Sequence, residues 1–417
     1  MTVQPVLPLA TRLAALVPPG RFARLGVAVS GGGDSMALMH LLADYRAAGG
    51  PEPFVVSLNH GLRPESEAEV AMVARAAAGL GLSHRALLWR GAEARGNLMA
   101  AARAARYRLI AEWARTEGLP AVALGHTADD QGETFLMRLA RGAGLSGLSA
   151  MAGERRAEGM LWLRPLLAST RAELRDWLRA RGVGWVDDPS NDDVSYERVR
   201  ARAALAALAP LGITAPGVAE VTAHLREVRD ALDAATHAAA LALVRFDAGD
   251  LLIDRHGLSL LPAETRRRLM AHALRWLAGA EHAPRGPALA EFVAAALAGA
   301  PATLHGCLGL PEGATLRLCR EAAACGGPVT PGALWDGRWR LIGPDTPGTE
   351  VRALGEAGLR ACLNWRSAGR PRAALAASPA LWRGAELVAA PLAGVGTEWR
   401  AEPARDGDDF LTAIFVH

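Results

Sequence analysis

The stretch Gly26-Val-Ala-Val-Ser-Gly-Gly-Gly-Asp-Ser35 decides the fold that we expect for this chain. Its first four residues form a short apolar run typical of a buried strand, and the three glycines predict a tight turn. From Met36 onward the pattern Met-Ala-Leu-Met-His-Leu-Leu is that of a helix. A glycine turn at a helix N-terminus exposes backbone N–H groups and partial positive charge. The stretch therefore predicts a cradle for a phosphate or pyrophosphate.

The form of this loop narrows the nucleotide chemistry. A Walker loop needs Gly-x-x-x-x-Gly-Lys-Ser/Thr and a dinucleotide fingerprint needs Gly-x-Gly-x-x-Gly, and neither is present. The 417 residues contain no lysine, which excludes a Walker lysine and a lysyl-nucleotide intermediate. Residues 30–35 resemble the pyrophosphate loop of ATP pyrophosphatases, which cleave ATP between the α- and β-phosphates to adenylate a substrate. The alternative is an ordinary glycine-rich turn.

Strand and helix patterns alternate after this loop. Apolar runs predict strands at 53–59, 83–89 and 119–124, and helical patterns cover 66–79 and 97–117. This alternation predicts an α/β domain with a doubly wound parallel sheet. Ligands of such sheets bind outside the carboxyl ends of the strands. Because polar clusters follow three of these strands, at 30–35, 59–63 and 125–133, we expect them to share one site.

The segment 125–134 reads Gly-His-Thr-Ala-Asp-Asp-Gln-Gly-Glu-Thr. Thr127 is the expected N-cap of the next helix, and Asp130 and Glu133 share one helix face because they are three residues apart. Acidic residues can simply complement the helix dipole there, and for Asp129 the two interpretations stay open. For the Asp130–Glu133 pair beside His126 we favour a pocket for a cationic group or a metal.

Length and composition bound the class of protein. A chain of 417 residues with 51% hydrophobic residues and a net charge of +3 predicts a globular protein of two or three domains. The N-terminus lacks signal-peptide features and no apolar run reaches the ~20 residues of a membrane span, so we expect a cytoplasmic enzyme without membrane contact. The four cysteines lie beyond residue 306 and show no zinc or disulfide spacing.

Six motifs in order allow a closer identification. They are Ser-Gly-Gly-Gly-Asp-Ser (30–35), Asn-His-Gly-Leu-Arg-Pro (59–64), Ala-Arg-Ala-Ala-Arg-Tyr (102–107), the 125–134 segment, Arg-Pro-Leu-Leu (164–167) and Trp-Val-Asp-Asp-Pro-Ser-Asn (185–191). Together they resemble the bacterial tRNA(Ile)-lysidine synthetase family over residues 26–202. The resemblance implies a ligase that uses ATP to activate C2 of the wobble cytidine in an isoleucine tRNA with a CAU anticodon. Free L-lysine is then joined there, giving lysidine, AMP and pyrophosphate through an adenylated cytidine.

The resemblance also implies roles for individual residues. Ser30, Gly31, Gly32, Gly33, Asp34 and Ser35 would bind ATP, with Asp34 carrying Mg²⁺. Arg106 would neutralise charge on the α-phosphate, and His126 would assist removal of a proton from the attacking amine. Asp130 and Glu133 would bind the lysine substrate. The tRNA-binding residues would be Arg63, Arg198, Arg200 and Arg202, although a solvated helix face also explains the last three.

This chain departs from the family pattern at Met99, where many members have glutamate, and at Val199, where asparagine is frequent. Three alternatives to the lysidine ligase remain: a tRNA thiolase, an amidating synthetase and a catalytically silent tRNA-binding protein. Missing N-terminal cysteines oppose the first, no amidotransferase domain supports the second, and the intact acidic residues oppose the third.

The rest of the chain is less specific. We expect an ATP-binding catalytic domain at 1–209, a small, mostly helical tRNA-binding domain at 217–325 and a small β-rich C-terminal domain at 328–417. Residues 251–261 read as a hairpin and Asp336-Gly337 as a tight hairpin turn. A homodimer stays an open alternative for the assembly.

Overall fold

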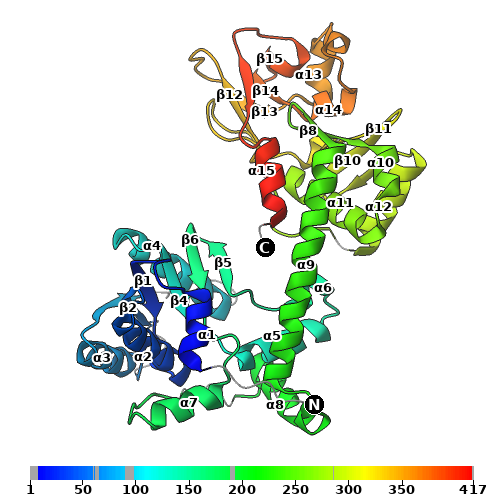
Figure 1. The fold of residues 1–417 in the computed structure, drawn as a ribbon. Helices are drawn as coiled ribbons and strands as arrows, with labels where there is room; N and C mark the ends of the chain where they lie inside the picture. Colours follow the sequence, from blue (N-terminus) through cyan, green and yellow to red (C-terminus); the bar gives the residue numbers. More distant parts are fainter. Residues whose placement is uncertain are drawn as a thin grey trace. The chain divides into compact units, whose positions relative to one another are not determined.

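The computed structural model describes residues 8–59, 61, 65–89, 98–187, 193–284 and 286–415. Contacts divide the chain into two compact units between Arg229 and Asp230, within helix α9 (Ala215–Leu243). Figure 1 shows the first unit from blue to green and the second from green to red. The three expected domains, 1–209, 217–325 and 328–417, are not tested by this division and stay a prediction.

The first unit is an α/β domain. Its strands are β1 (Arg24–Ala28), β2 (Glu52–Asn59), β3 (Ser83–Leu88), β4 (Ala121–Leu124), β5 (Glu154–Ala157) and β6 (Met160–Leu163). Its helices before α9 are α1 (Leu9–Leu16), α2 (Gly33–Ala47), α3 (Glu65–Gly79), α4 (Leu98–Thr116), α5 (Ala128–Ala140), α6 (Leu145–Leu148), α7 (Arg171–Arg179) and α8 (Glu197–Leu208). The six strands run in the order β3-β2-β1-β4-β6-β5, and only β5 is antiparallel to its neighbour. The expected parallel α/β fold is confirmed.

Both faces of this sheet are covered, which explains why its strands read as continuous apolar runs. Successive residues of β4 alternate between the two cores: Ala121 and Ala123 pack with α1, α2, α3 and α7, whereas Val122 and Leu124 pack with α4. Because the two cores on the faces of the sheet are formed by apolar side chains, the functional groups lie where the strands end.

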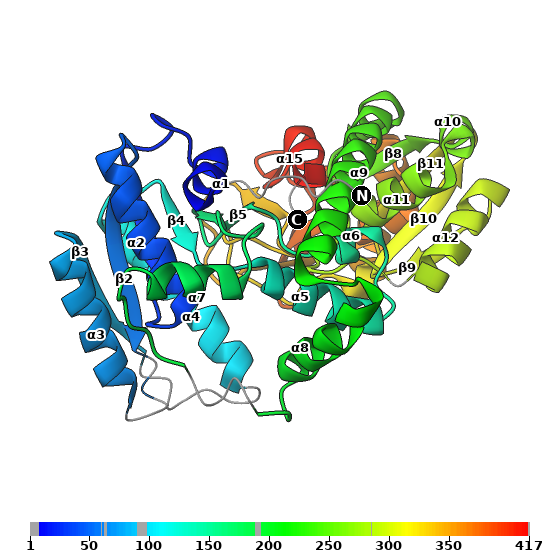
Figure 2. The ribbon, with the colours of Figure 1, turned by 60° about the horizontal axis from the view of Figure 1, so that its bottom comes forward.

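The position of the site follows from the strand order. β1 lies between β2 and β4, so the chain leaves the first half of the sheet at β3 and returns beside β1. The loops after β1 and β4 therefore diverge at a topological switch point, which is where doubly wound sheets bind ligands. Helix α8 packs against α5 and borders the same region (Figure 2).

Gly125 joins β4 to the site and approaches the pyrophosphate loop closely. A Cβ at this residue would lie 2.9 Å from the Asp34 carbonyl oxygen and 3.0 Å from Ser35 Cα, both backbone atoms that cannot turn away. We expect Gly125→Ala to lower the free energy of unfolding by about 1–3 kcal/mol and to weaken binding of an ATP analogue. Urea unfolding and analogue fluorescence measure the two effects. Gly184→Ala is the control, because a Cβ there meets nothing within 4 Å.

The second unit contains three antiparallel sheets. The first has the order β7-β8-β11-β10-β9 and packs against α11 and α12. Its elements are β7 (Val244–Asp247), β8 (Asp250–Asp254), α10 (Arg255–Leu260), α11 (Ala263–Ala278), α12 (Gly286–Ala298), β9 (Ala302–Leu304), β10 (Cys307–Glu312) and β11 (Thr315–Arg320). The other sheets are β12-β16 and β13-β14-β15, with the short helices α13, α14 and α15. Their bounds are β12 (Trp339–Ile342), β13 (Glu350–Ala353), α13 (Gly355–Ala361), α14 (Arg372–Ala376), β14 (Pro379–Arg383), β15 (Glu386–Ala389), β16 (Arg400–Pro403) and α15 (Gly407–Thr412).

The hairpin expected at 251–261 is wrong. Strand β8 pairs instead with the preceding β7 across a turn at Ala248-Gly249, where both residues have positive φ. Residues 255–260 form α10, because the Asp254 side chain accepts hydrogen bonds from the backbone N–H groups of His256 and Gly257 and so caps a helix. The turn at Asp336-Gly337 is confirmed, since both residues have positive φ.

Helix α15, near the C-terminus, packs against α11 in the core of the second unit. Phe410 is fully buried there, with ring centroids 5.4 Å from Trp276 and 4.6 Å from His272. The His272 Nε2 lies 2.8 Å from the Phe410 carbonyl oxygen.

Among the described residues no single helix is long and apolar enough to cross a membrane, although the bent pair Glu197–Leu211 and Ala215–Leu243 passes that test jointly.

The buried His272 makes the stability of the second unit depend on pH. Burial lowers the pKa of His272 from 6.5 to about 4, despite its bond to the Phe410 carbonyl. Between these values the unfolded chain binds a proton that the folded chain excludes, so stability falls as pH falls. We expect a loss of about 2 kcal/mol between pH 7 and pH 5 from this residue. Urea unfolding should show a shallower pH dependence in His272→Gln, and an unchanged one in His256→Gln, which alters an exposed histidine.

Candidate functional site

The loop between β1 and α2 is held closed by two serines. The Ser35 Oγ donates to the Gly32 carbonyl at 2.9 Å, accepts from the Ser30 N–H at 3.1 Å and lies 3.2 Å from the Ser30 Oγ. Gly31 has φ +90°, a left-handed conformation that L side chains rarely adopt. The loop therefore presents the N-terminus of α2, including Gly33 and Asp34, as a preformed anion site.

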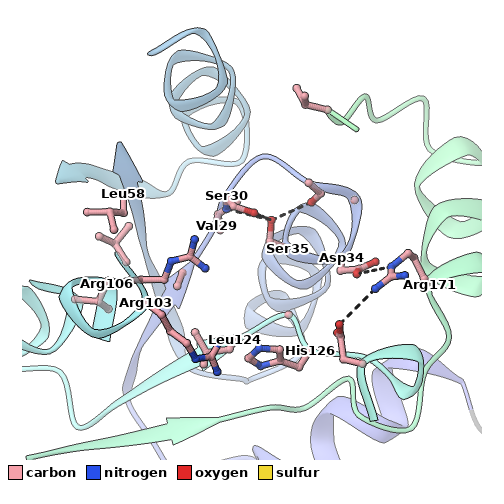
Figure 3. Close-up of a pocket in the computed structure, with 18 of the residues that line it drawn as sticks. Val29, Ser30, Asp34, Ser35, Leu58, Arg103, Arg106, Leu124, His126 and Arg171 are labelled. Atoms are coloured by element: carbon pink, nitrogen blue, oxygen red, sulfur yellow. Dashed lines mark hydrogen bonds and ion pairs between the residues drawn. The ribbon is translucent and has the colours of Figure 1, made fainter. Parts of the chain in front are cut away.

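A cavity of about 570 Å³ opens in front of this loop. One wall is apolar and includes Val56, Leu58, Leu124 and Trp162. Charged side chains also line the cavity: α4 contributes Arg103 and Arg106, the end of β4 and the start of α5 contribute His126 and Asp130, and α7 contributes Arg171 and Arg175. Figure 3 shows Arg103 and Arg106 on the side of Leu58 and Leu124, and Arg171 with Asp34 on the other side. The size and the mixed lining suit a nucleotide with its base on the apolar side.

Arg171 connects the loop to the acidic residues of α5. Its Nε lies 3.1 Å from Asp34 Oδ2, its Nη2 3.4 Å from Asp130 Oδ1 and its Nη1 3.5 Å from Glu133 Oε1. Its backbone N–H donates to Asp129 Oδ2 at 2.7 Å. The carboxylates of Asp130, Asp34 and Glu133 raise the pKa of Arg171 even though burial acts in the opposite direction.

Two further arginines reach the same carboxylates from α8. Arg198 Nε lies 2.6 Å from Glu133 Oε2 and its Nη2 3.0 Å from Asp130 Oδ1, while Arg202 Nε lies 2.9 Å from Glu133 Oε1. The Glu133 side chain is only 1% exposed. Arg198, Arg202 and Arg171 together therefore compensate the charge of a carboxylate that water cannot reach.

Asp130 also fixes the start of α5. Its Oδ2 accepts from the Thr127 N–H at 2.8 Å, and the Thr127 Oγ1 accepts from the Asp130 N–H at 3.4 Å, which makes a capping box. Burial would raise the pKa of Asp130, but Arg198 and Arg171 outweigh it and hold that pKa below its usual value. Asp130 is thus ionised and rigidly placed.

Asp34 has a different environment. Burial raises the pKa of Asp34 although Arg171 opposes this, and its Oδ1 is buried without a hydrogen-bond partner. No group of three or more metal-ligating side chains occurs within the described ranges. A single carboxylate with a free oxygen beside a phosphate-binding loop fits Mg²⁺, which is commonly held by one or two carboxylates together with substrate phosphates.

His126 is a weak base in this arrangement. Burial lowers its pKa to about 4, and Nδ1 is buried without a hydrogen-bond partner. The imidazole is therefore neutral at pH 7, but its affinity for a proton is below the optimum for a general base at that pH. Its proposed role in proton removal stays a prediction.

The structure brings most of the expected site residues to one cavity. The lining includes Ser30, Gly32, Gly33, Asp34, Ser35, Arg106, His126, Asp130 and Arg202. Glu133 lies behind Asp130, and Arg198 contacts both. Arg200 instead donates to the carbonyls of Val194 and Ser195. Arg63 lies outside the described residues.

The sequence prediction omitted Arg171, Arg103 and Arg175. A sequence signal for Arg171 was available: it is the first residue of α7, which begins with a capping box of Thr170 and Glu173. Because α7 follows β6 after a loop, its first residue lies near the carboxyl ends of the strands, where ligands of such sheets bind.

Comparisons with known proteins find relatives along most of this chain. A family described as the PP-loop domain matches residues 6–209. The tRNA(Ile)-lysidine synthase of Ruegeria pomeroyi is 52% identical over 395 residues, 94% of each chain. The tRNA(Ile)-lysidine synthase of Brucella anthropi is 37% identical over 389 residues, 87% of this chain and 84% of that protein. A solved U34-tRNA thiolase from Methanococcus maripaludis is 14% identical with a TM-score of 0.46, over 52% of this chain and 78% of that one.

Proposed function

This chain belongs to the tRNA(Ile)-lysidine synthase family, and on that premise we propose that it joins free L-lysine to C2 of the wobble cytidine of an isoleucine tRNA with a CAU anticodon. ATP is consumed to AMP and pyrophosphate. The observation that carries the proposal is that one cavity combines a pyrophosphate loop, two arginines of α4 and Asp130, which shares Arg171 and Arg198 with Glu133. We further propose that the enzyme works in the cytoplasm.

The first half of the reaction uses the loop and α4. The backbone N–H groups around Gly32 and Gly33 bind the ATP phosphates, and Ser30 and Ser35 keep the loop in shape. Mg²⁺, when bound at Asp34, neutralises charge on the phosphates. Arg106 points into the cavity from α4 (Figure 3) and stabilises the charge that develops on the α-phosphate as the cytidine oxygen attacks.

The second half uses the carboxylates of α5. Asp130 and Glu133 attract the ammonium groups of lysine, and His126 lines the same cavity as Asp130. The attacking amine displaces AMP from the adenylated cytidine, and its proton passes to a neighbouring base, for which His126 is our candidate.

Binding of the tRNA needs cations outside the cavity. Arg63, Arg198, Arg200 and Arg202 are our candidates for contacts to RNA phosphates. Arg198 and Arg202 are 39% and 36% exposed, so that each guanidinium can serve RNA only if it shares or leaves its carboxylate. Arg200 keeps its guanidinium on backbone carbonyls at the surface, where a phosphate can join it. A homodimer also stays within this proposal as an untested assembly.

Incubation of the purified protein with ATP, Mg²⁺, labelled lysine and CAU isoleucine tRNA tests the proposal. We expect label in the tRNA and an equal amount of AMP. A tRNA with guanosine at the wobble position is the matched control and should acquire no label. Absence of tRNA-dependent lysine incorporation would contradict the proposal, and AMP formation without label would indicate a different adenylating enzyme.

A further inference from the structure

Each carboxylate oxygen of Asp130 and Glu133, the proposed lysine-binding residues, already accepts a hydrogen bond in this structure. Asp130 Oδ2 accepts from Thr127, and Asp130 Oδ1 is shared by Arg171 and Arg198. Glu133 Oε1 is shared by Arg171 and Arg202, while Oε2 accepts from Arg198. An ammonium group carries three donors and must therefore compete with these guanidinium groups for the two carboxylates.

The contact distances indicate which guanidinium leaves. Arg198 and Arg202 approach Glu133 to 2.6 and 2.9 Å, whereas Arg171 lies 3.4 and 3.5 Å from Asp130 and Glu133. Arg171 thus contacts three carboxylates, and its contacts with Asp130 and Glu133 are longer than those of Arg198 and Arg202. Its backbone is fixed by Asp129, so the side chain can turn while the start of α7 stays in place.

Arg171 also contacts the start of α2 beside the phosphate loop, because its Nε lies 3.1 Å from Asp34 Oδ2. If Asp34 turns to Mg²⁺ and phosphates arrive in front of α2, Arg171 loses one anionic partner and gains a stronger one on the same side. Asp130 and Glu133 then keep Arg198 and Arg202 as partners but have lost Arg171. The ammonium of the substrate can take the place that the Arg171 guanidinium has left.

We propose that Arg171 is a positioning residue that keeps the lysine site closed until nucleotide binds, so that ATP binds first and lysine second. This inference rests on the proposed function. It assigns to Arg171 a coupling between two ligands of one cavity, because both ligands favour the same displaced position of its side chain.

Thermodynamic linkage gives the test. Titration of L-lysine into the whole protein, with and without α,β-methylene-ATP and Mg²⁺, should show lysine affinity raised about tenfold or more by the analogue, within the range common for coupled sites. Lysine must raise the affinity for the analogue by the same factor, because binding coupling is reciprocal. This pair of titrations needs no variant. Equal lysine affinity in both states would overturn the inference.

Arg171→Gln supplies the second arm. It should bind lysine without nucleotide, and the coupling factor should fall to about twofold or less, while a melting curve checks folding. Arg179→Gln on the same helix, where the arginine is exposed and pairs with Asp176, should keep the wild-type coupling. Retained coupling in Arg171→Gln would overturn the inference. If lysine binds in neither state and is not incorporated into tRNA, the proposed function fails too. If lysine is incorporated into tRNA but the analogue does not change lysine affinity, only the inference about Arg171 is overturned.

Discussion

Asp34→Asn is expected to reduce pyrophosphate release at least about 10³-fold, a barrier increase of about 4 kcal/mol. The substitution keeps the size of the side chain but removes the charge that attracts Mg²⁺. Oδ1 is buried without a partner, so in the free protein the substitution weakens only the contact of Oδ2 with Arg171 among the interactions of the described residues. Arg171 retains Asp130 and Glu133 as partners, so that the loop should keep its shape.

The measurement follows pyrophosphate and tRNA binding side by side. We expect tRNA affinity of Asp34→Asn to stay within about twofold of the wild type, because Asp34 faces the nucleotide and RNA binding depends on cations. Asp44→Asn is the matched control: it lies on the same helix, is exposed and pairs with Arg181. Parallel loss of tRNA binding and pyrophosphate release would mean that Asp34 is structural.

The strand-loop-helix stretch was predictable because all its signals are local. The apolar run of β1, the glycines and the serines that close the turn lie within ten residues. The same holds for Thr127 and Thr170, whose caps depend on a residue three positions away. Such patterns determine local structure without contacts to distant residues.

What the sequence could not predict are contacts between distant residues. The spacing of Arg198 and Arg202 places both on one face of α8, but only the packing of α8 against α5 shows that this face meets Glu133. Arg171 and Asp34 are 137 residues apart. In the second unit, the pairing of β8 with β7 was missed because Val244–Asp247 is a short strand that follows α9 directly, with no turn residue to mark where it begins.

The same long-range contacts make Glu133→Gln the substitution with the second largest expected effect. A neutral amide leaves three arginines around a buried position with one fewer negative charge. Removal of one member of a buried ion pair costs about 3–5 kcal/mol. Arg198 and Arg202 are more than a third exposed and can turn partly to solvent. We therefore expect the free energy of unfolding of the first unit to fall by about 2–3 kcal/mol.

The catalytic effect of Glu133→Gln should separate the two half-reactions. Adenylation uses the phosphate loop, Asp34 and Arg106, which the substitution leaves in place, so pyrophosphate release with ATP and tRNA should change little at a temperature where the variant is folded. The KM for lysine should rise about 100-fold, as expected when a buried charge partner worth about 3 kcal/mol is lost.

Glu197→Gln is the control for this experiment. Glu197 lies on α8 near the same arginines, but it is exposed and pairs with Arg141. Its replacement should change neither stability by more than about 0.5 kcal/mol nor the KM for lysine. If Glu133→Gln lowers stability while the KM for lysine stays unchanged, Glu133 serves only to hold α5 and α8 together. The ammonium of the substrate must then bind elsewhere in the cavity, with Asp130 as the remaining carboxylate on α5 that lines it.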